Sequence, residues 1–226
     1  MEEKSKIYEV DNLCFSYGKT TVLDDANLCL NQGDFAALIG SNGAGKTTFI
    51  KLLLGILSPQ EGRVLFKGRD VSGMGYSNKV RYVPQLVSGR TDFPISVMEL
   101  VASGLLPEKF SKEEQRSRTR DILSLVGLQG KEEELYGSLS GGQRQRALIA
   151  RAMISMPEVL LMDEPTSGID APSTQELWDL LRHLNEVHGI TIFIISHDMH
   201  RLAQGGAEIY LLEDGKIREG GLHGNF

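Results

Sequence analysis

The residues best suited to chemistry form a glycine-rich segment with the sequence GSNGAGKT at positions 40–47. It follows an apolar stretch, residues 35–39, that is typical of a β-strand, and it precedes a predicted helix over residues 48–57. Glycines let backbone N–H groups turn toward a phosphate, and a helix amino terminus adds positive potential. The lysine supplies a fixed charge for the outer phosphates, and the hydroxyl after it can ligate Mg²⁺. The segment therefore predicts a nucleotide-phosphate site made by Gly40, Asn42, Gly43, Gly45, Lys46, Thr47 and Thr48.

Two adjacent carboxylates end the apolar segment 158–162, which is predicted to be a strand. Beside a phosphate-binding loop, an acid at the end of such a strand lies next to the metal, so we expect Asp163 to hold Mg²⁺ through water. Neighbouring side chains on an extended chain point to different sides, which leaves Glu164 free to face the attacking water as general base. On its own the acidic pair is equally compatible with a solvated strand end. The glycine-rich loop favours the catalytic interpretation.

A second glycine pair lies in the sequence LSGGQRQR at positions 139–146, ahead of a predicted helix over residues 143–155. This segment resembles the signature sequence of ABC ATPases, a pattern that other P-loop families lack. It would offer a second helix amino terminus to an anion. Two such helix ends in one chain indicate that each ATP lies between the phosphate loop of one copy and the signature segment of another. An ordinary capped helix is the alternative. The residues of this predicted contact are Ser140, Gly141, Gly142 and Gln143.

The resemblance to ABC ATPases extends over essentially the whole chain, with further motifs in the family's order. It implies that Tyr17 stacks on adenine, that Gln85 senses Mg²⁺ and water, and that His197 contacts the γ-phosphate and orders the attacking water. The segment SGID that ends at Asp170 resembles the loop that crosses the dimer interface, with Asp170 as its acid. Gly168 departs from the family, in which alanine is frequent at this place. We expect that difference to affect loop stiffness more than chemistry.

Strands and helices must position these motifs, and the first third of the chain is predicted to consist mainly of strands. Residues 8–17 and 63–66 have strand character. Residues 28–30 and 35–39 flank a turn at 31–34, which is typical of a β-hairpin.

The rest of the chain is predicted to be helical first and then mixed. Residues 95–155 have a helical pattern, with capping-box spacing between Ser111 and Glu114. In the last third a strand, a helix and a strand follow one another, which favours a parallel sheet. The helix between these strands is predicted to start with a capping box formed by Ser173 and Glu176.

The predicted fold class is α/β, a P-loop NTPase core of the RecA-like type with an antiparallel β subdomain and a helical insertion. We expect one ABC ATPase domain over residues 1–226. Residues 1–85 and 156–226 would form the catalytic core with the β subdomain, and residues 86–155 the helical subdomain that carries the signature sequence.

The composition excludes several classes of protein. Of the 226 residues, 41% are hydrophobic and 24% charged, and the formal net charge of −6 argues against binding to nucleic acid or an anionic membrane through a basic face. The amino terminus lacks the apolar core of a secretory signal, and no segment approaches the roughly 18 apolar residues of a membrane span. Cys14 and Cys29 have no CxxC spacing, and we expect two buried thiols in preference to a disulfide.

Among ABC proteins, a transporter motor is expected, because the chain has neither the long coiled-coil insertion nor the second ATPase unit that soluble ABC machines usually carry. Such a subunit would use ATP and Mg²⁺, form a homodimer and attach to integral membrane permease subunits at the cytoplasmic face of the membrane. An extracytoplasmic solute-binding protein would complete the system. Nucleic acid is not an expected partner. A switch module that does not transport is the rival interpretation. A P-loop kinase would leave residues 139–146 unexplained.

The cargo is indicated by one segment, DFPISVMELVASG at residues 92–104. It is similar to the corresponding stretch in ATPases of bacterial zinc and manganese importers, and related sequences occur in haem and iron-siderophore importers. This region is expected to meet the membrane subunit, so it indicates the lineage of that partner. A divalent metal is therefore the favoured cargo, and haem or siderophore import remains open.

Overall fold

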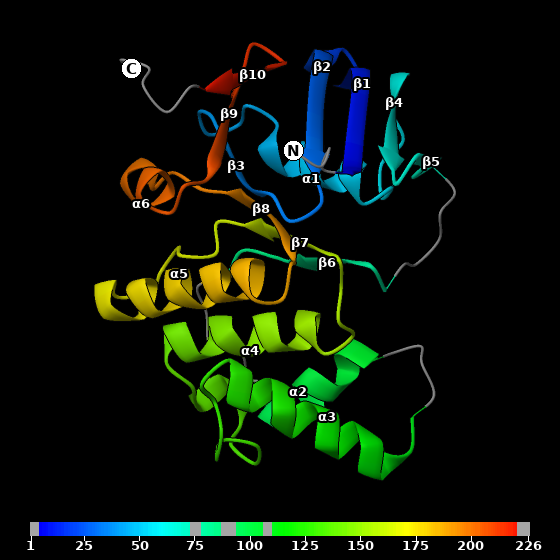
Figure 1. Ribbon diagram of the computed structural model, residues 1–226. Helices are drawn as coiled ribbons and strands as arrows, with labels where there is room; N and C mark the ends of the chain where they lie inside the picture. Colours follow the sequence, from blue (N-terminus) through cyan, green and yellow to red (C-terminus); the bar gives the residue numbers. More distant parts are fainter. Residues whose placement is uncertain (1–4, 73–77, 87–93, 106–109, 221–226) are drawn as a thin grey trace.

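Two β-sheets lie one above the other, with helices between them and below them, in the computed structural model (Figure 1). The structure describes residues 5–72, 78–86, 94–105 and 110–220. The larger sheet has the strand order β10-β9-β3-β8-β7-β6, and its strands run parallel except for β10. Its strands are β3 (Phe35–Ile39), β6 (Val80–Val83), β7 (Val159–Asp163), β8 (Thr191–Ile195), β9 (Glu208–Glu213) and β10 (Lys216–Gly220).

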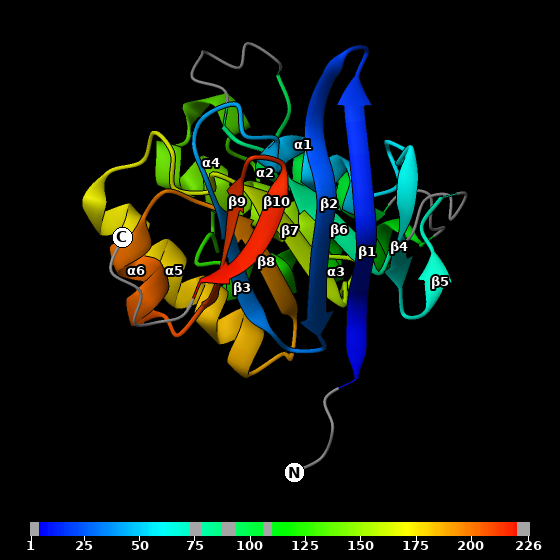
Figure 2. The ribbon, with the colours of Figure 1, turned by 90° about the horizontal axis from the view of Figure 1, so that it is seen from above.

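The smaller sheet is antiparallel, as expected for the β subdomain, and has the order β2-β1-β4-β5. Its strands are β1 (Lys6–Tyr17), β2 (Thr20–Asn31), β4 (Glu61–Phe66) and β5 (Arg69–Asp70). Seen from above, β1 and β2 run side by side, with β10 next to β2 (Figure 2). A backbone hydrogen bond from Asp24 N to Gly215 O (2.9 Å) joins the two sheets at this edge.

Helix α1 (Lys46–Leu53) lies between the sheets and is buried against both. The apolar side chains that it contributes are Phe49, Ile50, Leu52 and Leu53, all 1% exposed or less, whereas Thr47 and Lys51 on the same helix are exposed. The hydroxyl of the buried Tyr8 on β1 donates to Leu53 O (3.0 Å) and satisfies a carbonyl at the end of the helix. The antiparallel sheet thereby fixes the position of the helix that follows the phosphate loop.

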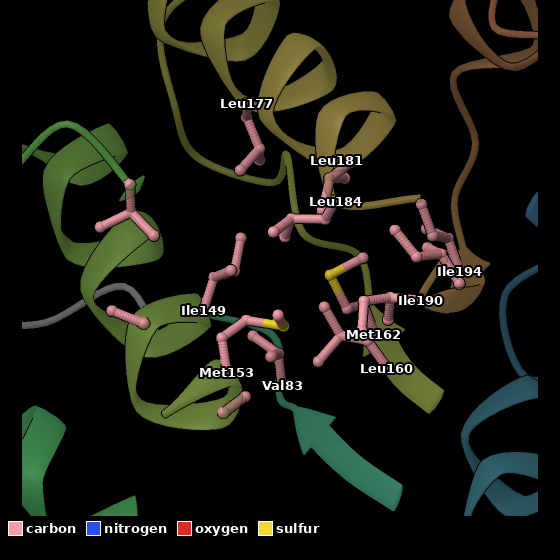
Figure 3. Close-up of a cluster of buried hydrophobic side chains, with 14 of the residues drawn as sticks. Val83, Ile149, Met153, Leu160, Met162, Leu177, Leu181, Leu184, Ile190 and Ile194 are labelled. Atoms are coloured by element: carbon pink, nitrogen blue, oxygen red, sulfur yellow. The ribbon is translucent and has the colours of Figure 1, made fainter. Parts of the chain in front are cut away.

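The other face of the parallel sheet is covered by α4 (Gly141–Met153) and α5 (Ala171–Glu186). Because β3, β7 and β8 are covered on both faces, all five residues of each strand are buried. Figure 3 shows the contact between these layers, with Ile149 and Met153 of α4 and Leu177, Leu181 and Leu184 of α5 directed at side chains of the sheet. The remaining helices are α2 (Val97–Ala102), η1 (Ser103–Leu105), α3 (Lys112–Leu125), η2 (Tyr136–Ser138) and α6 (Met199–Gln204).

Gly104 has a packing role within the segment that suggested the cargo. A Cβ at this position would lie 2.0 Å from Arg151 O and 2.8 Å from Ile154 Cγ2, so η1 approaches α4 too closely for any side chain. Arg81 strengthens the junction by donating to Gly104 O (2.8 Å) and to Ser155 Oγ (2.7 Å). Part of this segment is therefore explained by internal packing. Its first two residues, 92 and 93, lie outside the described part of the chain.

The predicted hairpin at residues 28–39 is wrong, because β2 and β3 belong to different sheets. The turn is present, with Asp34 N donating to Asn31 O (3.2 Å), but it passes the chain from one sheet to the other. Both faces of strand β3 are apolar, so the strand is stable only inside a sheet whose two faces are covered. It therefore pairs with β8 and β9 of the larger sheet. Gly33 N donates to Thr191 Oγ1 (2.9 Å), a contact between the turn and the first residue of β8.

Three helix starts also differ from prediction. The capping box predicted at Ser173 and Glu176 is wrong, because α5 begins three residues earlier with Asp170 as its N-cap and a proline in its first turn. Helix α1 begins at Lys46 and α4 at Gly141, each two residues before the predicted start. The capping box predicted at Ser111 is confirmed.

The expectation of buried cysteines is wrong too. Cys14 is half-buried and Cys29 exposed, and both are free thiols. Side chains alternate across a strand, and Leu28 and Leu30 take the inward positions of β2 beside Cys29. Within the described residues, no helix is both long enough and apolar enough to cross a membrane. The division into a core and a helical subdomain remains a proposal, because α4 shares one apolar core with the parallel sheet.

Candidate functional site

The carboxyl ends of the parallel strands meet at one edge of the sheet and bring the predicted residues together. Strand β8 lies between β3 and β7, so Ile195 pairs with Leu38 on one side and with Asp163 on the other. The glycine-rich loop after β3, the acids at the end of β7 and His197 after β8 therefore share this edge. In open α/β sheets, ligands bind outside the carboxyl ends of the strands.

A cleft of about 520 Å³ lies at this edge. Eleven of the residues that line it are predicted site residues: Tyr17, Asn42, Gly43, Gly45, Lys46, Thr47, Thr48, Gln85, Asp163, Glu164 and His197. Three others, Val22, Ser167 and Ile195, were not predicted as site residues. Val22 and Ile195 have no polar atom that a sequence motif could reveal, and Ser167 appears in the sequence only as the first residue of a loop. The cleft has the convergent polar groups expected of a nucleotide site.

The glycine-rich loop is shaped by contacts that exclude side chains. Gly45, the N-cap of α1, has a φ of +105°, and a Cβ there would lie 2.4 Å from Val22 Cγ1. A Cβ on Gly40 would lie 2.5 Å from Leu212 O. No side chain caps α1, so the N–H groups of its first turn remain available to an anion.

Lys46 is held inside this loop. Its side chain donates from Nζ to Gly40 O (2.8 Å) and Ser41 O (2.9 Å), and the residue is only 7% exposed. The ammonium group is thereby fixed beside the amino terminus of α1. A positive charge and a helix end directed at the same place favour a polyanion.

Two of the three side chains predicted to meet Mg²⁺, those of Thr47 and Asp163, lie in contact. Thr47 Oγ1 donates to Asp163 Oδ2 (2.7 Å), which joins the start of α1 to the end of β7. Tyr82 on β6 lies beside Asp163, and burial, followed by the charge of Asp163, raises the pKa of Tyr82 to about 12. The described residues contain no group of three or more His, Cys, Asp or Glu side chains suited to a metal. One hydroxyl and one carboxylate fit Mg²⁺, which keeps several waters and takes its other ligands from nucleotide phosphates.

Glu164 occupies a strained position at the end of β7. Its φ is +45°, in the left-handed region, and its N–H donates to Ile195 O (2.9 Å). Its Oε1 lies 2.8 Å from His197 Nε2 but makes no hydrogen bond within the described part of the chain. Burial raises the pKa of Glu164, and Asp163 adds to the rise, while His197 and Lys46 oppose it. A half-buried carboxylate with a raised pKa, beside a histidine, is suited to accept a proton from water.

Two further predicted residues, Gln85 and Tyr17, also line the cleft. Gln85 Nε2 donates to Ser167 Oγ (3.3 Å), so this glutamine reaches the loop that follows the acids. Tyr17 is 51% exposed and forms an edge-to-face pair with Phe15, with ring centroids 5.0 Å apart. One face of an exposed aromatic ring in this position can stack on a base.

Six predicted residues do not line the cleft. Gly40 lies at the start of the glycine-rich loop, and the other five are Ser140, Gly141, Gly142, Gln143 and Asp170. These five lie together at the starts of α4 and α5. Ser140 forms a capping box with Gln143, and Asp170 accepts from Ser173 N (2.9 Å). A Cβ on Gly142 would lie 2.5 Å from Ser173 Cβ, so this glycine is needed for the close approach of the two helices. One copy of the chain thus has the glycine-rich loop in its cleft and the predicted signature segment outside it.

Comparison with known proteins places these features in one family. The model of the ABC transporter family matches residues 23–167. The zinc transport system ATP-binding protein AdcC of Streptococcus pneumoniae is 40% identical over 194 residues, which cover 84% of this chain and 82% of that protein. The methionine import ATP-binding protein MetN of Geobacillus kaustophilus is 36% identical over 98% of this chain, which spans only 64% of that relative.

Solved structures share the fold. The dimeric, post-hydrolysis structure of the ATP-binding cassette MJ0796, bound to ADP and phosphate, aligns with a TM-score of 0.80 and 27% identity. The alignment covers 97% of this chain and all of that one. The names of further relatives, 34 or 35% identical, refer to spermidine and putrescine, zinc, and Fe(3+) import.

Proposed function

Because this chain belongs to the ABC transporter family and is an ABC-type ATPase, we propose that it is the ATP-hydrolysing subunit of a membrane importer. The observation that carries the proposal is the convergence of Lys46, Thr47, Asp163, Glu164 and His197 on one cleft. These side chains supply a phosphate-binding charge, two groups suited to Mg²⁺, a base and an orienting histidine. Together they meet the requirements of phosphoryl transfer to water.

In the proposed mechanism, each group of the chain has one task. The loop N–H groups and Lys46 hold the β- and γ-phosphates, and Tyr17 stacks on the base. Thr47 and Asp163 would hold Mg²⁺, with Gln85 near it, and the ion would neutralise phosphate charge. Glu164 accepts the proton of the attacking water, and His197, 2.8 Å away, orders that water against the γ-phosphate.

We further propose that two copies close around two ATP molecules. The support is the helix end at Ser140, Gly141 and Gly142, which lies outside the cleft of its own chain. In a second copy it could face the γ-phosphate from the opposite side, with Gln143 and Asp170 at the same interface. Loss of the γ-phosphate after hydrolysis would remove the charge that bridges the copies and let them part.

The partners that this ATPase drives are proposed to be two integral membrane permease subunits. The chain would then act at the cytoplasmic face of the membrane, bound through these partners, with an extracytoplasmic solute-binding protein in the full system. The family and the importer names of its relatives support this arrangement.

For the cargo we propose a divalent metal, zinc or manganese. The 40% identity to a zinc system and the sequence at residues 94–104 support it. Relatives of nearly equal identity are named for the import of methionine, of spermidine and putrescine, and of Fe(3+) ions. The second candidate is haem or siderophore import, which the related sequences of residues 92–104 support.

Uptake by cells that lack the gene tests both parts of the proposal. We expect the deletion to reduce uptake of radioactive zinc or manganese to background, and restoration by the wild-type chain but not by its Glu164→Gln variant. If only methionine or haem uptake falls, the cargo is wrong and the motor function stands. If no uptake changes and the chain co-purifies with DNA or ribosomes in place of a polytopic membrane protein, the chain is a switch module.

A further inference from the structure

Ser167 joins two parts of the cleft that are far apart in the sequence. Its hydroxyl accepts a hydrogen bond from Nε2 of Gln85 (3.3 Å), which lies 82 residues earlier. Its backbone N–H donates to Glu164 O (3.0 Å). One residue therefore contacts both the backbone of the proposed base and the side chain of the proposed sensor of Mg²⁺ and water.

We propose that Ser167 is a positioning residue for Gln85, a role that rests on the proposed ATPase function and adds a residue that the mechanism above does not use. With Nε2 bound to the serine, the amide oxygen of Gln85 is directed away from Ser167. Of the two amide groups, only this oxygen can ligate a hard cation or accept a hydrogen bond from water. With Nε2 bound to the serine, the oxygen end of the amide remains available to the cleft.

The serine is itself well fixed, whereas the glutamine is not. Ser167 is half-buried and tied to Glu164, whose own N–H is bonded to Ile195 O (2.9 Å) at the end of β8. Gln85 is exposed and follows β6 by two residues. An exposed glutamine loses rotamer freedom when it is held in one geometry, and holding it before the reaction removes that cost from the chemical step. Because Ser167 is fixed and Gln85 is not, the hydrogen bond that Gln85 donates holds the glutamine in place.

A pair of variants of matched shape tests the hydrogen bond. Ser167→Thr keeps the hydroxyl, and Ser167→Val has the shape of threonine without it. We expect the valine variant to lower kcat about fivefold with KM for ATP changed less than about twofold, and the threonine variant to stay within about twofold of wild type. When Gln85 is replaced by alanine, the two variants should hydrolyse ATP at equal rates. A purely structural role for the hydroxyl would preserve the difference between them.

The side-chain amide of Gln85 gives a second readout, which needs neither nucleotide nor turnover. In nitrogen-15 spectra of the full chain, these signals are identified by their loss in the Gln85→Glu variant. We expect Ser167→Val, but not Ser167→Thr, to shift them. Equal rates for the valine and threonine variants, or an unmoved amide signal in the valine variant, overturn the proposal. If the wild-type chain fails to hydrolyse ATP, the proposed function is wrong, while the amide signal still reports on the Ser167–Gln85 contact.

Discussion

The Glu164→Gln variant is expected to bind ATP with Mg²⁺ as tightly as the wild-type chain but to hydrolyse it about 10²- to 10⁴-fold more slowly. Glutamine keeps the size of the side chain and removes the group that accepts the proton. The position itself is held by the backbone, through the Glu164 N–H bond to Ile195 O (2.9 Å), which the substitution leaves intact. Because the γ-phosphate then stays in place, the variant should accumulate as a dimer with ATP. Phosphate release and size-exclusion chromatography measure the two effects.

The matched control for this variant is Glu158→Gln, at the opposite end of the same strand. Glu158 forms ion pairs with Lys67 and Lys79 at the surface and lies outside the cleft. Its substitution removes the same charge from the chain, and we expect turnover to stay within about twofold, because surface ion pairs contribute little. Hydrolysis by Glu164→Gln at the parental rate would show that another group acts as the base.

Replacing Lys46 by methionine is expected to weaken ATP binding on the order of 10- to 100-fold. A hydrogen bond to a charged group contributes about 1.5–3 kcal/mol, and each 1.4 kcal/mol or so is a factor of ten in affinity. Methionine retains most of the volume of a side chain that is only 7% exposed, so the loop keeps its packing. Titration calorimetry with a non-hydrolysable ATP analogue and Mg²⁺ measures the affinity.

Lys51→Met provides the comparison, since it removes the same charge from the last turn of the same helix, where the lysine is exposed. Its affinity should match that of the wild type. If both lysine variants bind equally well, the ammonium group of Lys46 does not contact phosphate, and the loop has been given the wrong role.

The sequence predicts the chemistry of the cleft better than the connections between its elements. The phosphate loop, the acids after β7 and His197 after β8 are found because each follows a short apolar strand, and parallel strands carry their carboxyl ends to one edge. Their pattern is local, and the structure places them on one cleft. The antiparallel sheet and the helical region are confirmed in outline as well.

The wrong predictions have a common physical cause. A local sequence pattern does not determine which distant segment packs against it. The turn before β3 has hairpin chemistry, but burial on both faces of β3 decides its partners. The start of α5 is set by Asp170 and the following proline, which compete successfully with the capping-box spacing at Ser173. Ser167 and Val22 line the cleft because the fold brings distant segments together. No motif spacing in the sequence identifies them as site residues.

The most direct test of the account is a structure of the Glu164→Gln variant with ATP and Mg²⁺. We predict two copies with the triphosphate of each ATP enclosed by the loop around Lys46, a magnesium ion at Thr47, and the helix end at Ser140 and Gly141 of the other copy against the γ-phosphate. ATP bound elsewhere on the chain, or bound in this cleft in a dimer whose two signature helix ends face solvent, would contradict it.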